Sequence, residues 1–304
     1  MKTSVIVTTL NEEKTIAGLL DALIGQSHLP DEIVIVDGGS TDGTRQIIKT
    51  YAKQFPRLKI RHFLKRGTIG VGRNLAAKKA QHSLLAITDA GCVPDRMWLA
   101  ELLKEYYRDR QPIVAGFYRG IPRNNFEEAV VPFVLVMPDK LNPDNFLPAT
   151  RSMLIEKKVF LEIGGFNPRL KAGEDYDLAL RLQKKFGYKK TFAFTQKAVV
   201  GWLPRSNLKD FAVMIFRMAR GDAQAHHLRP SLLHLFGRYA VGIPLTFLLA
   251  KIWWSLAMFP FIAYLLFAIA KNFRYASRGW FYLPTLQIVS DGAVMLGTAL
   301  GLLL

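Results

Sequence analysis

Three carboxylates crowd into four positions of a chain that is otherwise strongly basic. Glu174, Asp175 and Asp177 stand in the stretch AGEDYDLALRL of a 304-residue sequence whose formal net charge is +17. Carboxylates this close raise one another's pKa, which suits one of them to accept a proton as a general base. The apolar residues that follow predict a helix beginning at these acids. Acids in a first helical turn also offset the helix dipole, and we expect that role of Asp177.

Polar side chains also stand at the ends of three apolar runs in the first third of the chain. Asn11 follows SVIVTTL, Asp37 ends EIVIVD and Asp89 ends SLLAITD. Continuous apolar runs of this length predict buried strands, and helical patterns between them predict a parallel sheet covered on both faces. Ligands bind at the carboxyl ends of the strands in such sheets. We therefore expect these three residues to share one site.

The elements that must position this site follow from the same pattern. We expect strands at residues 4–10, 32–37, 58–63 and 83–89, each followed by a helix. From residue 111 to residue 165 the alternation weakens, and several prolines indicate irregular backbone that shapes a binding cleft. We expect an α/β catalytic domain over residues 1–230 and a membrane region over residues 231–304.

The membrane region contains two apolar runs. Residues 239–270 carry Lys251 as their one charge, and residues 281–304 are interrupted only by Asp291. A membrane-spanning helix needs about 20 apolar residues, and both runs are long enough. The alternative is a buried helical hairpin of a soluble domain, but runs so poor in charge favour a membrane.

The number of crossings stays open at this stage. Lys271, Arg274 and Arg278 lie between the two runs, and cationic loops favour the cytoplasm. A basic N-terminal domain without a visible signal peptide is also expected in the cytoplasm. The first run then forms a hairpin or re-entrant pair, with a break near Lys251 or Pro260. The other arrangement is two plain spans joined by a basic outer loop.

Composition narrows the function classes. A sequence pI near 10.0 means that the surface attracts polyanions such as anionic lipid or phosphorylated substrates. No nucleic-acid recognition motif is present, so we expect no nucleic-acid partner. The single cysteine, Cys92, excludes an intramolecular disulfide and a four-cysteine zinc site.

Five motifs together indicate a family. VIVTTLNEEKTI, EIVIVDGGSTDGT, TDAGC, GGFNPRLKAGEDYDLALRL and FRMARG resemble, in this order, the motifs of family-2 glycosyltransferases over about residues 1–225. The resemblance implies the GT-A fold, a Rossmann-like, mostly parallel sheet with helices on both faces, and inverting transfer from a nucleotide-sugar donor. The C-terminal runs resemble the transmembrane helices of membrane-anchored members.

The resemblance assigns nucleotide contacts to residues near the predicted strand ends. These are Thr9, Asn11, Glu12, Asp37, Arg73 and Asp89. A carboxylate at position 37 can accept a hydrogen bond from a nucleobase, although DGGSTDGT is also turn chemistry in its own right. Arg73 meets the base or the diphosphate in one interpretation and is a solvated side chain in the other.

TDAGC occupies the position of the family's D-x-D motif, which holds Mg²⁺ or Mn²⁺ between the donor phosphates. Asp89 matches the first aspartate, but Gly91 replaces the second. One carboxylate is a poorer ligand set than two. We still expect a divalent cation at Asp89, although the motif alone does not establish it.

The resemblance also assigns the reaction chemistry. Asp175 matches the family's general base, which takes the acceptor's proton opposite the leaving diphosphate, and Glu174 orients it or the acceptor. Ser152 and Gly165 lie on segments that line the donor-sugar and acceptor side.

FRMARG resembles a shortened form of a family motif that clamps the pyrophosphate. Arg217 and Arg220 share one helical face, and the family's Gln and Trp are absent here. The two arginines stabilise charge on the departing nucleotide or attract anionic lipid headgroups.

We therefore expect a glycosyltransferase at the cytoplasmic face of the inner cell membrane, with a lipid-linked or saccharide acceptor. Three other classes are weighed against it. Gly91 makes a nucleotide-binding membrane protein without turnover conceivable. A nucleotidyltransferase needs a glycine-rich basic loop after the first strand, and an NAD-dependent oxidoreductase needs G-x-G-x-x-G there; TTLNEEKT is neither. The sequence does not indicate the nucleotide, the sugar or the oligomeric state.

Overall fold

A computed structural model describes residues 1–143, 146–187 and 192–303. The chain divides into two compact units. The first unit comprises residues 1–120 and 138–203, and the second comprises residues 121–137 and 204–304. The expected boundary at residue 230 between a catalytic domain and a membrane region stays a prediction.

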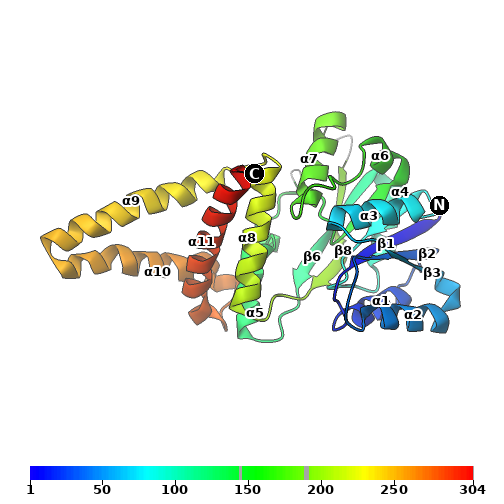
Figure 1. Cartoon of the computed structure of the whole chain (residues 1–304), viewed down its shortest axis with the longest axis horizontal. Coiled ribbons are helices and arrows are strands. Elements are labelled where there is room, and N and C mark those ends of the chain that lie inside the picture. Colours follow the sequence, from blue (N-terminus) through cyan, green and yellow to red (C-terminus); the bar gives the residue numbers. More distant parts are fainter. Residues whose placement is uncertain (144–145, 188–191, 304) are drawn as a thin grey trace. The chain divides into compact units, whose positions relative to one another are not determined.

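The first unit begins with the predicted βαβ pattern. Strands β1 (Thr3–Thr9), β2 (Glu32–Asp37), β3 (Ile60–Leu64) and β4 (Leu84–Ile87) are parallel and lie in the order β3-β2-β1-β4. Helices α1 (Ile16–Ile24), α2 (Thr44–Gln54) and α3 (Ile69–Lys79) connect them. Figure 1 shows α1 and α2 on one side of the strands and α3 on the other. The fold is therefore α/β, with helices on both faces as expected.

The rest of the sheet is mixed rather than parallel. Strands β7 (Met153–Glu156), β6 (Ile113–Gly120), β8 (Phe192–Trp202) and β5 (Cys92–Pro94) extend it beyond β4 in that order. β7 is antiparallel to β4 and β6, and β5 is antiparallel to β8. The short turn Pro56–Leu58 and helices α4 (Trp98–Asp109), α6 (Lys157–Glu162) and α7 (Glu174–Phe186) complete this unit, with the turn Pro138–Lys140. The segment expected to be irregular thus supplies two sheet strands.

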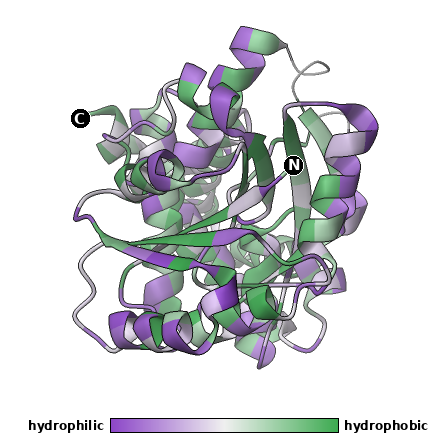
Figure 2. Ribbon diagram, turned by 90° about the vertical axis from the view of Figure 1, so that its right-hand side faces the viewer, coloured by the Kyte–Doolittle hydropathy of each residue, from purple (hydrophilic) through white to green (hydrophobic). Residues whose placement is uncertain are grey.

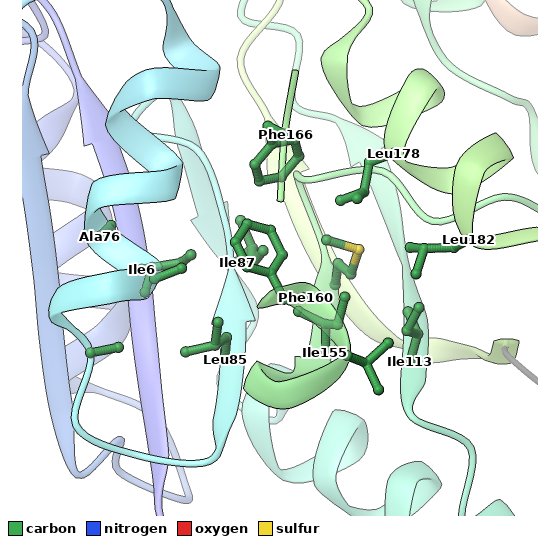
Figure 3. Packing of buried hydrophobic residues seen from close by; sticks show 14 of the residues in the cluster. Ile6, Ala76, Leu85, Ile87, Ile113, Ile155, Phe160, Phe166, Leu178 and Leu182 are labelled. Atoms are coloured by element: carbon green, nitrogen blue, oxygen red, sulfur yellow. The ribbon is translucent and has the colours of Figure 1, made fainter. Parts of the chain in front are cut away.

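One apolar core joins the sheet to the helices above it. Phe160 and Phe166 pack with their ring centroids 5.4 Å apart. Figure 3 shows them between strand β4 and helix α7, which contributes Leu178 and Leu182. Apolar residues colour most of the strands in Figure 2, whereas the surrounding helices alternate between polar and apolar faces. This core fixes α7, and with it the acidic cluster, against the sheet.

The second unit is helical. It contains α5 (Asn125–Val134), α8 (Leu208–Gln224), α9 (Ser231–Ile252), α10 (Met258–Asn272) and α11 (Leu283–Leu302), with short turns at Trp254–Ala257, Phe273–Tyr275 and Trp280–Tyr282. Side chains of Asn124 and Asn207 cap α5 and α8 by accepting hydrogen bonds from backbone N–H groups, each at 2.9 Å.

Helix α11 packs closely along α8 (Figure 1). A Cβ atom added to Gly297 would lie 2.5 Å from the carbonyl oxygen of Phe216, and one added to Gly301 would lie 2.6 Å from that of Arg220. Small residues at these two positions let the helix backbones approach. This contact explains why α8 belongs with the C-terminal helices.

In the part of the chain that the structure describes, three segments are long and apolar enough to cross a membrane, namely Ser231–Ile252, Trp254–Tyr275 and Trp280–Leu302. The first expected run is therefore two helices, which form a hairpin with a break at Trp253 (Figure 1). This agrees with the hairpin alternative that placed a break near Lys251.

A polar cluster joins these three helices. The buried carboxylate of Asp291 accepts hydrogen bonds from Arg238 at 2.5 Å, Tyr264 at 2.9 Å and Tyr239 at 3.1 Å. Gln287 donates to its other oxygen at 2.7 Å. Ionisable groups inside apolar helices are costly unless paired, so this cluster ties α9, α10 and α11 together.

Candidate active site

The turn after β2 is organised by Asp37. Its buried carboxylate accepts hydrogen bonds from the backbone N–H groups of Gly39 and Ser40, each at 2.8 Å, and from the Ser40 hydroxyl at 2.6 Å. This is the turn-forming geometry that the DGGST sequence suggested. Binding of a nucleobase by the same carboxylate stays a prediction.

Side chains of the loop after β1 hold this turn in place. Asn11 has the left-handed backbone (φ 56°) that Asn adopts more readily than most residues, and its side-chain oxygen accepts from Thr41 N–H at 2.9 Å. The N–H of Asn11 donates to Ser40 Oγ at 2.8 Å, and that of Glu12 donates to Thr44 Oγ1 at 2.8 Å. The carbonyl of the buried Thr9 accepts from Gly38 N–H at 2.8 Å. The four residues predicted after β1 and β2 therefore lie together.

Helix α3 carries the central cation of the site. Arg73 is only 2% exposed, donates to Asp89 at 2.5 Å and also hydrogen-bonds Glu174. Its guanidinium lies 5.3 Å from the ring centroid of Phe166. The alternative of a solvated arginine is wrong, because the side chain is buried between two carboxylates, and contact of Arg73 with a base or diphosphate stays a prediction. Arg73 thus brings together the end of β4 and the start of α7.

Burial and charge act against each other at this cluster. Burial lowers the pKa of Arg73, but the charges of Asp89, Glu174 and Asp175 outweigh burial and raise it above its ordinary value. Burial raises the pKa of Glu174, Arg73 acts against that rise, and Asp175 adds to it. The guanidinium therefore stays charged, while Glu174 holds a proton more readily than an exposed glutamate.

The acids of α7 have different environments. Asp175 is half-buried, and its carboxylate accepts from the N–H of Tyr176 at 2.8 Å. Asp177 is buried and pairs with Arg181 at 2.8 Å. Arg181 also donates to the carbonyl of Gly165 at 2.7 Å. Asp177 therefore fixes the loop before α7, beyond the dipole role expected of it, and Asp175 is the more accessible carboxylate.

The Gly164–Gly165 turn fits against α3. Gly165 has φ +68°, and an added Cβ would lie 2.5 Å from Asn74 Oδ1. Asn74 accepts from the N–H of Phe166 and donates to its carbonyl, each at 2.8 Å. The structure thus gives Gly165 a packing reason to be glycine. Contact with a sugar stays a prediction.

Ser152 has a different place from the one expected. Its hydroxyl is 1% exposed, accepts from Trp98 Nε1 at 2.9 Å and donates to the carbonyl of Ala198 at 3.0 Å. These bonds link helix α4 to strand β8. The hydroxyl is thereby engaged within the sheet, and contact of its segment with a sugar stays a prediction.

Two residues beside the predicted ones were missed. Asn74 holds the glycine turn, and Arg151 lies half-buried beside Tyr118 and Trp202. Asn74 could have been found, because it follows Arg73 within the same predicted helix. Arg151 gave no sequence signal, because the strand that follows it was not predicted.

Few of the described side chains near Asp89 could bind a divalent cation. Asp89 is 29% exposed and gives one oxygen to Arg73. Burial raises the pKa of the Cys92 thiol, which keeps it protonated and unsuited to bind a metal. Within residues 1–143, 146–187 and 192–303, no three His, Cys, Asp or Glu side chains converge on a metal position. Asp89 fits a cation that takes its other ligands from water and substrate phosphates.

Arg217 and Arg220 belong to helix α8 of the second unit. Arg217 is exposed, and Arg220 is half-buried beside Gly297 and Gly301 of α11. Among the described residues, the buried Nε of Arg220 has no hydrogen-bond acceptor. Their contact with a nucleotide stays a prediction.

The sequence matches known proteins over most of its length. Residues 4–166 match the family model described as glycosyl transferase family 2. Glycosyltransferase AglE of Haloferax volcanii is 26% identical over 239 residues, which cover 77% of each chain. The succinoglycan biosynthesis protein ExoA of Rhizobium meliloti is 26% identical over 266 residues, covering 82% of this chain and 78% of that protein.

Solved structures share the fold. The mannosyltransferase PcManGT of Pyrobaculum calidifontis, in complex with GDP-Man and Mn²⁺, aligns with a TM-score of 0.65 at 21% identity, covering 97% of this chain and 87% of that chain. TarS residues 1–349 of S. aureus, in complex with UDP-GlcNAc, align with a TM-score of 0.55 at 17% identity, covering 98% and 91%. The first unit and its sheet therefore have the GT-A fold.

Proposed function

Because the chain belongs to glycosyl transferase family 2, we propose that it moves a sugar from a nucleotide-sugar donor to a membrane-proximal acceptor, with inversion at the anomeric carbon. One observation carries this proposal. Arg73 joins Asp89, at the end of a central strand, to Glu174, which begins the helix carrying Asp175. A donor held at the strand ends can therefore be reached by a carboxylate of the acidic cluster.

The reaction is a single displacement. The acceptor oxygen forms a bond to the anomeric carbon while the bond from that carbon to the diphosphate oxygen breaks. The acceptor proton goes to Asp175, and the nucleoside diphosphate leaves with both electrons of the broken bond. Asp37 and the loop of Thr9, Asn11 and Glu12 hold the nucleoside.

Asp175 suits the base role better than its neighbour. Glu174 is 8% exposed and bonded to Arg73, so an acceptor hydroxyl has little access to it. Asp175 is half-buried and accepts one hydrogen bond from the backbone beside it. Glu174 therefore positions α7 through Arg73, and Asp175 keeps an oxygen for the acceptor.

The leaving diphosphate needs compensating positive charge. A divalent cation, as named in the mannosyltransferase complex with Mn²⁺, supplies it when bound. In this chain Asp89 is the residue that would hold the cation, together with the donor phosphates. From the FRMARG motif alone, we propose that Arg217 and Arg220 support the same charge.

The acceptor is proposed to lie at the membrane, on the cytoplasmic side. Three helices of the second unit are long and apolar enough to cross a bilayer. Lys271 and Arg274 stand at the end of one of these segments, and cationic residues there favour the cytoplasm. A lipid-linked or membrane-proximal saccharide fits this placement.

The full chain in detergent micelles, supplied with a panel of nucleotide sugars and membrane lipid extract, tests the proposal. We expect release of a nucleoside diphosphate from one donor, loss of most release with EDTA, and a product of inverted anomeric configuration by NMR. Nucleotide binding without donor consumption under any combination would instead support a binding protein.

A further inference from the structure

A second arginine lies at the edge of the sheet near Asp89. The guanidinium carbon of Arg151 is 5.7 Å from the ring centroid of Tyr118 and 5.5 Å from that of Trp202. Tyr118 comes from β6 and Trp202 from the end of β8. Aromatic faces hold a cation without neutralising it. The side chain is thus fixed in place while its hydrogen-bond donors remain usable.

The strand register brings the segments of Arg151 and of the D-x-D position to the same end of the β4–β7 ladder. Ile87 of β4 pairs with Met153 of the antiparallel β7. This pair is the last of the ladder, and Asp89 and Arg151 each stand two residues outside it, on the two chain segments that leave the ladder at this end. Cys92 pairs with Trp202, whose ring Arg151 contacts, and the N–H of Cys92 donates to the carbonyl of Asp89 at 3.1 Å. Both residues therefore lie close to Cys92.

Among the described residues, Arg151 has no carboxylate partner. Arg73 pairs with two carboxylates, and Arg119, at the end of β6, pairs with Asp95 at 3.0 Å. Within the described part of the chain, no carboxylate lies within ion-pair distance of Arg151. An anion is the natural partner for a half-buried guanidinium with which none of the described carboxylates pairs.

The charge of Arg151 matters because Gly91 stands where the D-x-D motif has its second aspartate. A Cβ added at Gly91 would meet no atom within 4 Å, so open space lies where a second aspartate would stand. With one carboxylate fewer, a divalent cation is held less firmly beside the donor phosphates. Arg151 stands just before β7, the strand beside β4, and offers a positive charge held by two aromatic rings.

We propose that Arg151 binds the diphosphate of the nucleotide-sugar donor and supplies part of the positive charge that a complete D-x-D motif would recruit through a metal. This inference rests on the proposed function. The planar guanidinium donates two parallel hydrogen bonds to phosphate oxygens, which a lysine cannot reproduce. Arg151 is therefore a binding residue that touches the leaving group.

Isothermal calorimetry on the full chain in detergent tests this, with UDP, GDP and the other common nucleoside diphosphates and then the matching nucleoside. We expect Arg151→Gln to weaken diphosphate binding about 10- to 100-fold, the loss for a hydrogen-bonded charged group, with nucleoside binding unchanged. Arg151→Lys should recover part of the loss. The matched control, Arg119→Gln, removes a cation that Asp95 already neutralises and should change binding less than about twofold.

Diphosphate binding by Arg151→Gln should also depend more strongly on Mn²⁺ than binding by the wild type, because the metal then supplies more of the positive charge at the phosphates. Equal diphosphate affinity in wild type and Arg151→Gln, with the thermal unfolding midpoint unchanged, would overturn the inference. Loss of transfer to a phosphate-bearing acceptor with diphosphate affinity intact would also overturn it and assign Arg151 to the acceptor. A wild-type chain that binds no nucleoside diphosphate would instead refute the proposed function.

Discussion

The buried arginine between two carboxylates should respond strongly to substitution. Arg73→Met keeps much of the side-chain volume but removes the charge from a residue that is 2% exposed. Glu174 is 8% exposed on its side chain, so it cannot regain full hydration when its partner is lost. Breaking a buried ion pair from one side costs about 3–5 kcal/mol. The unpaired Asp89 adds less to this free-energy cost, because its side chain is 29% exposed and water still reaches it.

The expected loss is large enough to measure in the full chain. For a unit of this size, 1 kcal/mol lowers the unfolding midpoint by about 2–4 °C, so Arg73→Met should lower it by about 6–20 °C. Hydrogen exchange of the amides of α3 and β1 assigns the loss to the first unit. The double variant Arg73→Met/Glu174→Gln should recover part of the stability, because the amide leaves no buried charge.

The loss should also depend on pH. Burial raises the pKa of Glu174 and Arg73 acts against that rise, so removing Arg73 raises the pKa further. A carboxyl whose pKa is higher in the folded state than in the unfolded state keeps its contribution at low pH and loses it as pH rises through the folded pKa. The deficit of Arg73→Met should therefore be larger at about pH 8 than at about pH 5. A cost below about 1 kcal/mol at both pH values, typical of an exposed pair, would refute the buried bridge.

Three further substitutions have expected outcomes. Gly91→Asp should lower the Mn²⁺ concentration for half-maximal transfer roughly tenfold, because the added carboxylate enters open space; an unchanged metal titration contradicts this. Gly165→Ala should cost about 1–3 kcal/mol more in unfolding free energy than Gly164→Ala, since both have positive φ but only Gly165 would clash; equal costs would refute the packing argument. Gly301→Leu should lower the thermal midpoint of the second unit, whereas Gly292→Leu, whose Cβ position is open, should not; matching midpoints would argue against the α8–α11 contact.

The first half of the fold could be predicted because local patterns determine it. Strands β1, β2 and β4 are continuous apolar runs, and their polar ends, Asn11, Asp37 and Asp89, follow directly from where the runs stop. The parallel connection through helices then sets these ends on one edge. The acidic start of α7 was also visible in the sequence, because Glu174 opens a helix with regular apolar spacing.

The second half could not be predicted in the same way. Strand β7 has four residues, and its place between β4 and β6 depends on long-range pairing that no local pattern encodes. The burial of Arg73 depends on Asp89 and Glu174 reaching it from distant segments. Arg151 depends on the same unpredicted strand. The break at Trp253 lies near Lys251, where the hairpin alternative placed it, but the sequence did not decide between that hairpin and a single span.

Single-turnover transfer by Asp175→Asn, measured beside nucleoside diphosphate binding to the same variant, tests the central claim most directly. We expect the transfer rate to fall about 10²–10⁴-fold, the contribution of a positioned general base, while the diphosphate binds as tightly as it does to the wild type. Asp177→Asn, in the same helical turn but paired with Arg181, is the matched control and should retain transfer. Near wild-type transfer by Asp175→Asn would remove Asp175 from the chemistry and contradict the account.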